Sequence, residues 1–299
     1  MLQQVPAGAP DPAGRRRPAL ITLGALAIAT AGGIIAAVAF AGAHGHGSSR
    51  ASDTGATTRS SSPAAGRSEK PRSSGPSGAA SSSPALSPDG RTLATGDMNG
   101  PAYLWNAGTG RQVAVLLDRG GAKVLAVAFS SDSAMVATGY GNGRTYVWKA
   151  ATGQSADTVV DPGGNAVNSV AFSPDGTTLA TGDANGSTYL WDITGGGHTI
   201  TLGRILADPA SGGIWAVAFS PDGKTLAMGG YHGSTYLWDA AGSAGSPAAT
   251  FTVAGGQEVT AVAFSPDGKT LATGNHSGTA YLWNLANGAH TVIAEPGPV

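Results

Sequence analysis

Short runs of alternating large and small residues recur along the last two thirds of the chain. The run Val262-Ala263-Phe264 has the alternation of a strand with one buried face. The turn sequence Ser265-Pro266-Asp267-Gly268 follows it, and a second apolar run occupies 270–274. A third run ends in Tyr281-Leu282-Trp283, which places the two aromatic rings on the same face of a strand. The pattern predicts three successive antiparallel strands joined by tight turns.

This pattern occurs five times at nearly constant spacing. The closing tryptophans lie 43, 43, 47 and 45 residues apart, and a Ser precedes each of them by 18 residues. Weaker apolar runs at 113–117, 158–160, 250–253 and 290–294 predict a fourth strand after the Trp. A period of about 40 to 50 residues is typical of a propeller blade. We expect the repeated aromatic residues to form the structural core: Trp105, Trp148, Trp191, Trp238, Trp283, Tyr103, Tyr146, Tyr189, Tyr236 and Tyr281.

With Phe-Ser-Pro-Asp-Gly, Leu-Ala-Thr-Gly and the Trp191-Asp192 and Trp238-Asp239 pairs, residues 84–299 resemble the WD-repeat family. The resemblance implies an all-β propeller of four-stranded antiparallel blades around a central channel. The chain departs from the family where a Gly-His usually precedes the first strand, since it has Gly163-Gly164 there. The Asp expected six residues before each Trp is replaced at every repeat, by Asn99, Asn142, Asn185, His232 and Ser277. The buried hydrogen-bond network of the family is therefore expected to be absent or rewired.

The number of repeats leaves the closure of the propeller open. Members of the family commonly have seven blades, whereas this chain has five repeats. The first repeat reads Pro84-Ala85-Leu86 where later ones read Val-Ala-Phe. The blade formed by this repeat is therefore expected to be incomplete and to lack its inner strand. A small five-bladed ring, an open arc that closes by association and a fragment of a longer ancestral propeller all fit. An open arc exposes strand edges that favour self-association.

The composition changes twice upstream of the repeats. Residues 18–41 contain no charged residue, follow Arg15, Arg16 and Arg17, and are predicted to form a transmembrane helix or signal anchor. Residues 1–17 would then be a short cytoplasmic N-terminus, and the propeller would lie outside the cytoplasm. Cleavage of a signal peptide near Ala41-Gly42-Ala43 is the alternative. Residues 42–83, rich in Ser, Gly and Pro, are expected to be a disordered linker.

Charge and chemistry exclude several function classes. With 17 basic and 18 acidic residues and no cysteine, we expect no nucleic-acid partner and no disulfide. The expected inner strands 124–129, 167–172, 214–219 and 259–264 contain no Asp or Glu, which argues against a glycoside hydrolase. His44 with His46 and His232 with His276 are too few for a metal site. We therefore expect no catalytic residues, cofactor or bound metal.

A binding surface is the remaining prediction. In the family that the chain resembles, partners dock on the rim formed by the second hairpins and the entrances of the inner strands. The matching positions are the partner-binding candidates, and Trp215 is the one Trp outside the repeat register: Trp215, Tyr140, Tyr231, His232, Leu125, Asn168, Thr260, Asp97, Asp183, Asn275 and His276. These features favour a membrane-tethered protein or peptide scaffold or sensor.

Two alternatives to the scaffold stay open. One is a small-ligand or carbohydrate receptor that uses the channel mouth. The other is a relic of a receptor-kinase ectodomain, since similar propellers follow a single membrane helix in actinobacterial receptor-type kinases. Only 17 residues precede the predicted helix here, so we expect no kinase domain before it.

Overall fold

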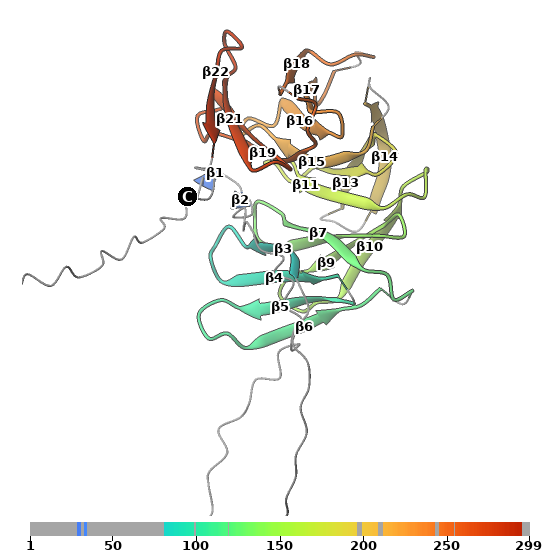
Figure 1. The fold of residues 1–299 in the computed structure, drawn as a ribbon. Helices are drawn as coiled ribbons and strands as arrows, with labels where there is room; N and C mark the ends of the chain where they lie inside the picture. Colours follow the sequence, from blue (N-terminus) through green and yellow to red (C-terminus); the bar gives the residue numbers. More distant parts are fainter. Residues whose placement is uncertain are drawn as a thin grey trace, which may run out of the picture.

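The computed structural model describes residues 81–294, except 99, 119, 196–198, 209–211, 243–244 and 254, and two short strands near the N-terminus. The described residues form strands joined by turns, bends and irregular loops. Five four-stranded antiparallel sheets follow one another around an arc, from β3–β6 at the bottom of Figure 1 to β19–β22 at the top. The all-β, blade-by-blade architecture predicted from the repeats is confirmed.

Each sheet is one blade, built from four strands that are consecutive in sequence. Blade 1 contains β3 (Ser81–Leu86), β4 (Thr92–Asp97), β5 (Ala102–Asn106) and β6 (Gln112–Leu116). Blade 2 contains β7 (Val124–Phe129), β8 (Met135–Tyr140), β9 (Arg144–Lys149) and β10 (Ser155–Val160). Blade 3 contains β11 (Val167–Phe172), β12 (Thr178–Asp183), β13 (Ser187–Thr194) and β14 (Thr199–Ala207). Blade 4 contains β15 (Ile214–Phe219), β16 (Thr225–Gly230), β17 (Ser234–Asp239) and β18 (Ala249–Thr252), and blade 5 contains β19 (Val259–Phe264), β20 (Thr270–Asn275), β21 (Thr279–Asn284) and β22 (His290–Ala294).

The repeated Ser-Pro-Asp-Gly turn is held by its own side chains. In blade 3 the Ser173 hydroxyl donates to Asp175 Oδ1 at 2.6 Å and accepts the N–H of Thr178 at 2.9 Å. Gly176 takes a φ of 72°, which favours glycine because it has no Cβ. The Asp is therefore a turn former, as expected, and the turn fixes how the first strand of each blade enters the second.

Blade 2 replaces that glycine by Ser133, which still adopts a φ of 62°. A non-glycine residue in this conformation is strained, at a cost of order 1 kcal/mol or more. The Ser133 hydroxyl compensates in part, because it accepts the backbone N–H of Asp89 in the neighbouring turn of blade 1 at 3.1 Å. Ser133 thus links the turns of two adjacent blades.

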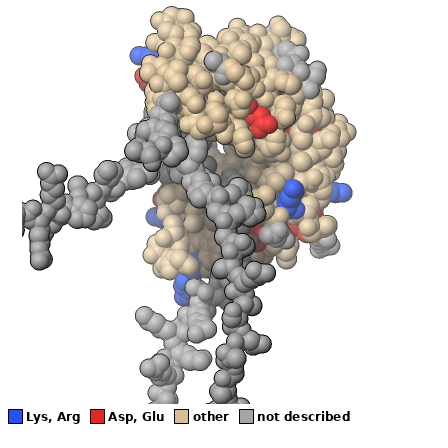
Figure 2. Space-filling view, in the orientation of Figure 1, with Lys and Arg blue, Asp and Glu red and all other residues tan. Residues whose placement is uncertain are grey.

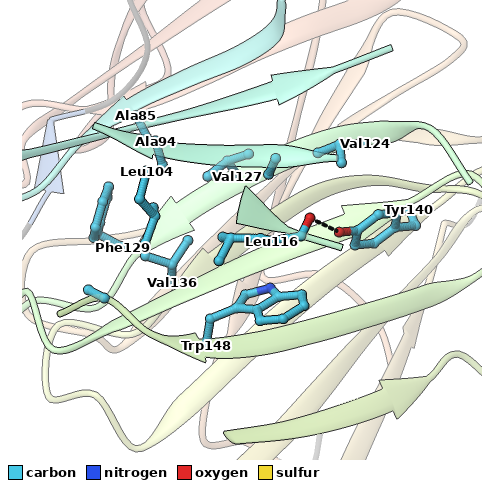
Figure 3. Close-up of a cluster of buried hydrophobic side chains, with 12 residues drawn as sticks. Ala85, Ala94, Leu104, Leu116, Val124, Val127, Phe129, Val136, Tyr140 and Trp148 are labelled. Carbon is cyan, nitrogen blue, oxygen red and sulfur yellow. Dashed lines mark hydrogen bonds between the residues drawn. The ribbon is translucent and has the colours of Figure 1, made fainter. Parts of the chain in front are cut away.

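The core lies between blades. Trp148 of blade 2 packs with buried residues of blade 1 that include Leu104 and Leu116, as Figure 3 shows. The same arrangement recurs for Trp191 on blade 2, Trp238 on blade 3 and Trp283 on blade 4. Each Trp therefore covers the apolar face of the preceding blade, and these four are buried as predicted.

The first blade differs from the sequence prediction in two ways. Its inner strand is present, because β3 pairs with β4 from Ser81 to Leu86 with one irregularity between Ser81 and Pro84. Pro84 is tolerated there since β3 is an edge strand of the sheet. In contrast, Trp105 is only half-buried, because no described blade precedes blade 1 to cover it. Tyr103 is half-buried as well, as is its equivalent Tyr146 in blade 2.

Part of the predicted transmembrane stretch 18–41 is described, and it is not helical. The strands β1 (Ala29–Thr30) and β2 (Gly33–Ile34) form a two-residue antiparallel pair, in register Ala29 with Ile34. The rest of that stretch, the N-terminus 1–17 and almost all of the predicted linker 42–83 lie outside the described residues. Among the residues described, no helix is long and apolar enough to cross a membrane.

Candidate binding rim

We call the edge formed by the second hairpins and the inner-strand entrances the hairpin rim. Blades 2 to 5 all have a β-bulge there, at the second residue of the inner strand: Leu125, Asn168, Trp215 and Thr260. A bulged residue has no partner across the ladder, and its side chain is redirected from the regular alternation. The structure thus places four of the predicted binding residues at one equivalent, irregular position.

The most exposed aromatic residues of the rim belong to blade 4. Trp215 and Tyr231 have exposed fractions of 38% and 45%, respectively. They lie at the same end of the β15–β16 pair, where Tyr231 N–H donates to the carbonyl oxygen of Gly213 at 3.0 Å. The rings of Tyr231 and His232 meet edge to face with centroids 5.3 Å apart. We call Trp215, Tyr231 and His232 the blade-4 aromatic patch.

The neighbouring rim residues support or extend this patch. Asn168 Nδ2 of blade 3 donates to the carbonyl oxygen of Ile214 at 3.0 Å and so braces the strand that carries Trp215. Leu125 is half-buried. On the next blade, Thr260 and His276 are exposed, and the Thr260 hydroxyl donates to the Gly274 carbonyl oxygen at 3.4 Å.

Four predicted binding residues are instead buried and serve the fold. Tyr140 is fully buried, its hydroxyl donates to the carbonyl oxygen of Leu116 at 3.4 Å, and burial raises its pKa to about 12 (Figure 3). Asp183 Oδ1 accepts the N–H groups of Asn185 and Ser187. Asn275 likewise accepts the N–H of Thr279, and Asp97 is also buried. These four candidates are buried because each is the last residue of the second strand of its blade, where its side chain points into the blade.

Sequence reasoning missed three buried carboxylates on the connections between blades. Asp118, Asp161 and Asp208 each lie 30 residues before the Trp of the next blade, namely Trp148, Trp191 and Trp238. Val253 takes that place before Trp283. The fixed spacing was the available signal, but it is visible only once the connections are aligned on the Trp that follows them.

Asp118 ties blade 1 to the hairpin rim of blade 2. Its carboxylate accepts the Tyr146 hydroxyl at 2.7 Å, Asn142 Nδ2 at 2.9 Å and the N–H groups of Gly120 and Ala122. Burial alone would raise the pKa of Asp118, but these donors outweigh it and lower the pKa. This carboxylate therefore stays charged and fixes the connection.

Asp161 completes a buried relay in blade 3. Trp191 Nε1 donates to Thr181 Oγ1 at 3.0 Å, and that hydroxyl donates to Asp161 Oδ1 at 3.0 Å. The pKa of Asp161 is raised to about 7, mainly by burial; the Thr181 hydrogen bond lowers this pKa and the nearby Asp183 charge adds to the rise. Burial also raises the pKa of Asp183, whose Oδ2 has no hydrogen-bond partner. The network that was expected to be absent or rewired is thus rewired through an aspartate.

Blade 4 lacks the first hydrogen bond of this relay, the one from the Trp indole to a Thr. The other four blades pair the Trp indole with a Thr, at Trp105–Thr95, Trp148–Thr138, Trp191–Thr181 and Trp283–Thr273. Blade 4 has the buried Met228 at the Thr position, and Trp238 Nε1 has no hydrogen-bond partner. The blade with the exposed aromatic patch therefore lacks the indole hydrogen bond that the four other blades have.

The described residues carry few titratable groups with raised pKa values and few charges on the face shown in Figure 2. Among the described residues, Asp161 and Asp183 are the carboxylates with a raised pKa, and both are buried. No group of three His, Cys, Asp or Glu residues able to hold a metal ion occurs in the described part of the chain. Figure 2 shows few and scattered charges on the face that it presents.

Comparisons with known proteins agree on one fold type. Residues 201–239 and 245–284 match the family model "WD domain, G-beta repeat", and residues 118–196 match "Vps8 beta-propeller". Among solved structures, a chain of "Crystal Structure of Mitotic Checkpoint Complex" is 25% identical with a TM-score of 0.60 and covers 70% of this chain. This chain spans 61% of the length of that one. No curated protein matched in sequence.

Proposed function

We propose that this chain binds a protein or peptide through the hairpin rim of blades 4 and 5. Its repeats are those of the WD40-repeat β-propeller family, which is generally a protein-interaction scaffold. One observation carries the proposal. The aromatic residues of the repeat register are buried or half-buried, whereas Trp215 and Tyr231 stand outside it and are exposed together on one blade. Trp and Tyr are enriched among residues that dominate binding energy at interfaces.

The surroundings of the patch favour a partner that brings its own apolar or aromatic side chain. Thr260 and His276 on blade 5 add exposed polar groups to the same rim, where the half-buried Glu258 accepts the His276 N–H through its backbone carbonyl at 3.0 Å. Asn168 braces the strand below Trp215, so little ordering is required on binding. The similar chain belongs to the mitotic checkpoint complex, and its presence in a complex supports a protein partner for this chain.

Replacing Trp215 and Tyr231 together by Ala is expected to weaken partner binding at least tenfold with little change in melting temperature. Truncating interface hot spots costs 2 kcal/mol or more, whereas exposed side chains add little to stability. The measurement is quantitative mass spectrometry of proteins cross-linked to the full chain in its own cells. Ile205→Ala is the control, since Ile205 is as exposed (50%) but lies on the outer strand of blade 3.

Proteins lost from the Trp215→Ala/Tyr231→Ala sample and retained by Ile205→Ala would identify the partner. Equal capture by both variants would overturn the blade-4 patch as the binding surface. If no protein depends on the patch, a panel of neutral oligosaccharides tests the carbohydrate-receptor alternative, because an exposed Trp also stacks on sugar rings.

We further propose that the scaffold is tethered to a membrane and displayed outside the cytoplasm. The charge-free stretch 18–41, directly after Arg15, Arg16 and Arg17, supports this topology. Protease added to intact cells is expected to remove a tag at Val299, with a fragment that begins at the N-terminus left in the membrane. Lysed cells serve as the control for accessibility. A tag that is protected until lysis would place the propeller in the cytoplasm.

A further inference from the structure

The two ends of the array carry complementary uncovered faces. Inner strands of successive blades contact one another from β3 through β7, β11 and β15 to β19, but within the described residues no comparable contact joins β19 to β3. No blade combines strands from both ends of the array, because each contains four consecutive strands. Among the described residues, no blade lies against the face of blade 1 that carries its Trp (the front face) or against the opposite face of blade 5 (the back face), although the short strand β2 contacts β3.

The front face of blade 1 is the face that carries the Trp. The Trp is buried in blades 2 to 5, as is the Leu or Val that pairs with it, but both are half-buried in blade 1 (Trp105 and Leu93). Ala107, two residues after Trp105, is exposed, whereas its equivalent Ala150 in blade 2 is buried. A groove on this face is lined by Leu93, Thr95, Trp105, Asn106, Ala107 and Gly110.

The back face of blade 5 shows the opposite half of the same interface. Ile293 lies across from Ala280, at the position that Leu116 occupies in blade 1, Val159 in blade 2 and Leu206 in blade 3. Those three residues are buried, whereas Ile293 is 48% exposed. Ala280 and Leu282 on the same face are only half-buried.

The interfaces inside the chain show what fits these faces. At the junction of blades 4 and 5, Phe251, the equivalent of Ile293, stacks on Trp283 with ring centroids 4.9 Å apart. A Cβ on Gly153, the equivalent of Gly110, would lie 3.3 Å from Leu116 at the junction of blades 1 and 2. Three junctions also place the equivalents of Ala107 and Ile293 in one apolar cluster: Ala150 with Leu116, Ile193 with Val159, and Leu285 with Phe251.

We propose that the chain associates head to tail with a second copy of itself. Ile293 on the back of blade 5 of one copy packs over Trp105 in the groove of blade 1 of the other, which continues the row of blade interfaces across two molecules. Such a contact joins two different surfaces, so it either closes into a ring or extends into a chain of copies. The inference does not depend on the hairpin rim, which lies on a different edge of the blades.

Cysteine cross-linking of the full chain tests this contact, because the chain has no cysteine of its own. Ala107→Cys and Ile293→Cys chains are mixed and treated with a short bismaleimide. We expect cross-linked dimers in this mixture at least tenfold above those from each variant alone. Val292→Cys replaces Ile293→Cys in the matched control, since Val292 is equally exposed (51%) but lies on the opposite face of the same strand.

Each other outcome overturns the proposal. Dimers from either variant alone would indicate a symmetric contact, and equal yields with Val292→Cys would indicate random collision. The remaining possibility is that the array closes on itself. It is tested with a chain that carries both Ala107→Cys and Ile293→Cys, because closure would give cross-links only within one molecule. Sedimentation of Ile293→Lys against Val292→Lys gives an independent readout, with self-association expected to weaken at least tenfold for the former alone.

Discussion

Replacing Trp191 by Ala is expected to lower the free energy of unfolding by about 3 to 5 kcal/mol, the range found for buried Trp and Phe truncations. Trp191 fills the junction between blades 2 and 3, where it packs with Val159 and Val170. The variant also removes the indole N–H from Thr181 and leaves the buried relay to Asp161 incomplete. Urea denaturation of the wild type and the variant measures the difference.

Trp215→Ala is the matched control, because it removes the same side chain from an exposed position of the rim. Its effect on the free energy of unfolding is expected to stay below about 1 kcal/mol. Equal losses for the two variants would contradict both the assignment of Trp191 to the inter-blade core and the assignment of Trp215 to the surface.

The free energy of unfolding is expected to fall as the pH rises from about 4 to about 7, because of Asp161. Burial raises the pKa of this carboxyl to about 7 in the folded chain, from a usual value of 3.8. Between these values the folded state holds a proton that the unfolded state has released, so raising the pH favours unfolding. At about 1.4 kcal/mol for each unit between the two pKa values, the loss is complete above pH 7 and amounts to about 4 kcal/mol.

Asp161→Asn should remove most of this dependence, since the amide oxygen can still accept the Thr181 hydroxyl but does not titrate. Asp183, whose pKa burial also raises, leaves a smaller slope of the same sign. Asp222→Asn is the control: a hydrogen bond from Ser220 lowers the pKa of that exposed carboxyl, so its contribution changes only below about pH 4. Denaturation midpoints are measured at pH 4.5, 5.5, 6.5 and 7.5. If the midpoints of wild type and Asp161→Asn change with pH in parallel, Asp161 is not the cause of the pH dependence.

Local chemistry made the strands of each blade predictable. The alternation in Val-Ala-Phe, the Ser-Pro-Asp-Gly turn and the Tyr and Trp two residues apart are set by neighbours within one repeat, and the structure places strands and turns there. The predicted fourth strands were also correct within a few residues. The nine-residue strand Thr199–Ala207 was missed, because it alternates weakly and most of its side chains are exposed.

Burial was less predictable, because it depends on the next blade and not on the repeat itself. Trp105 and Trp148 have the same local sequence context, but only Trp148 has a blade in front of it. Tyr140 reads as a turn residue, although its ring lies against Tyr146 inside the blade. The role of Asp161 was hidden for a related reason, since its partner Thr181 lies 20 residues further on and across a blade junction.

The consecutive order of the strands within each blade has a consequence for how the protein forms. Every sheet can be completed as soon as its own stretch of chain is available, and each new blade needs only the one before it. Each strand therefore contacts mainly its own blade or the neighbouring blade, and folding can proceed in the direction of synthesis without waiting for the C-terminus. The same independence lets whole repeats be added or lost during evolution without rebuilding the rest.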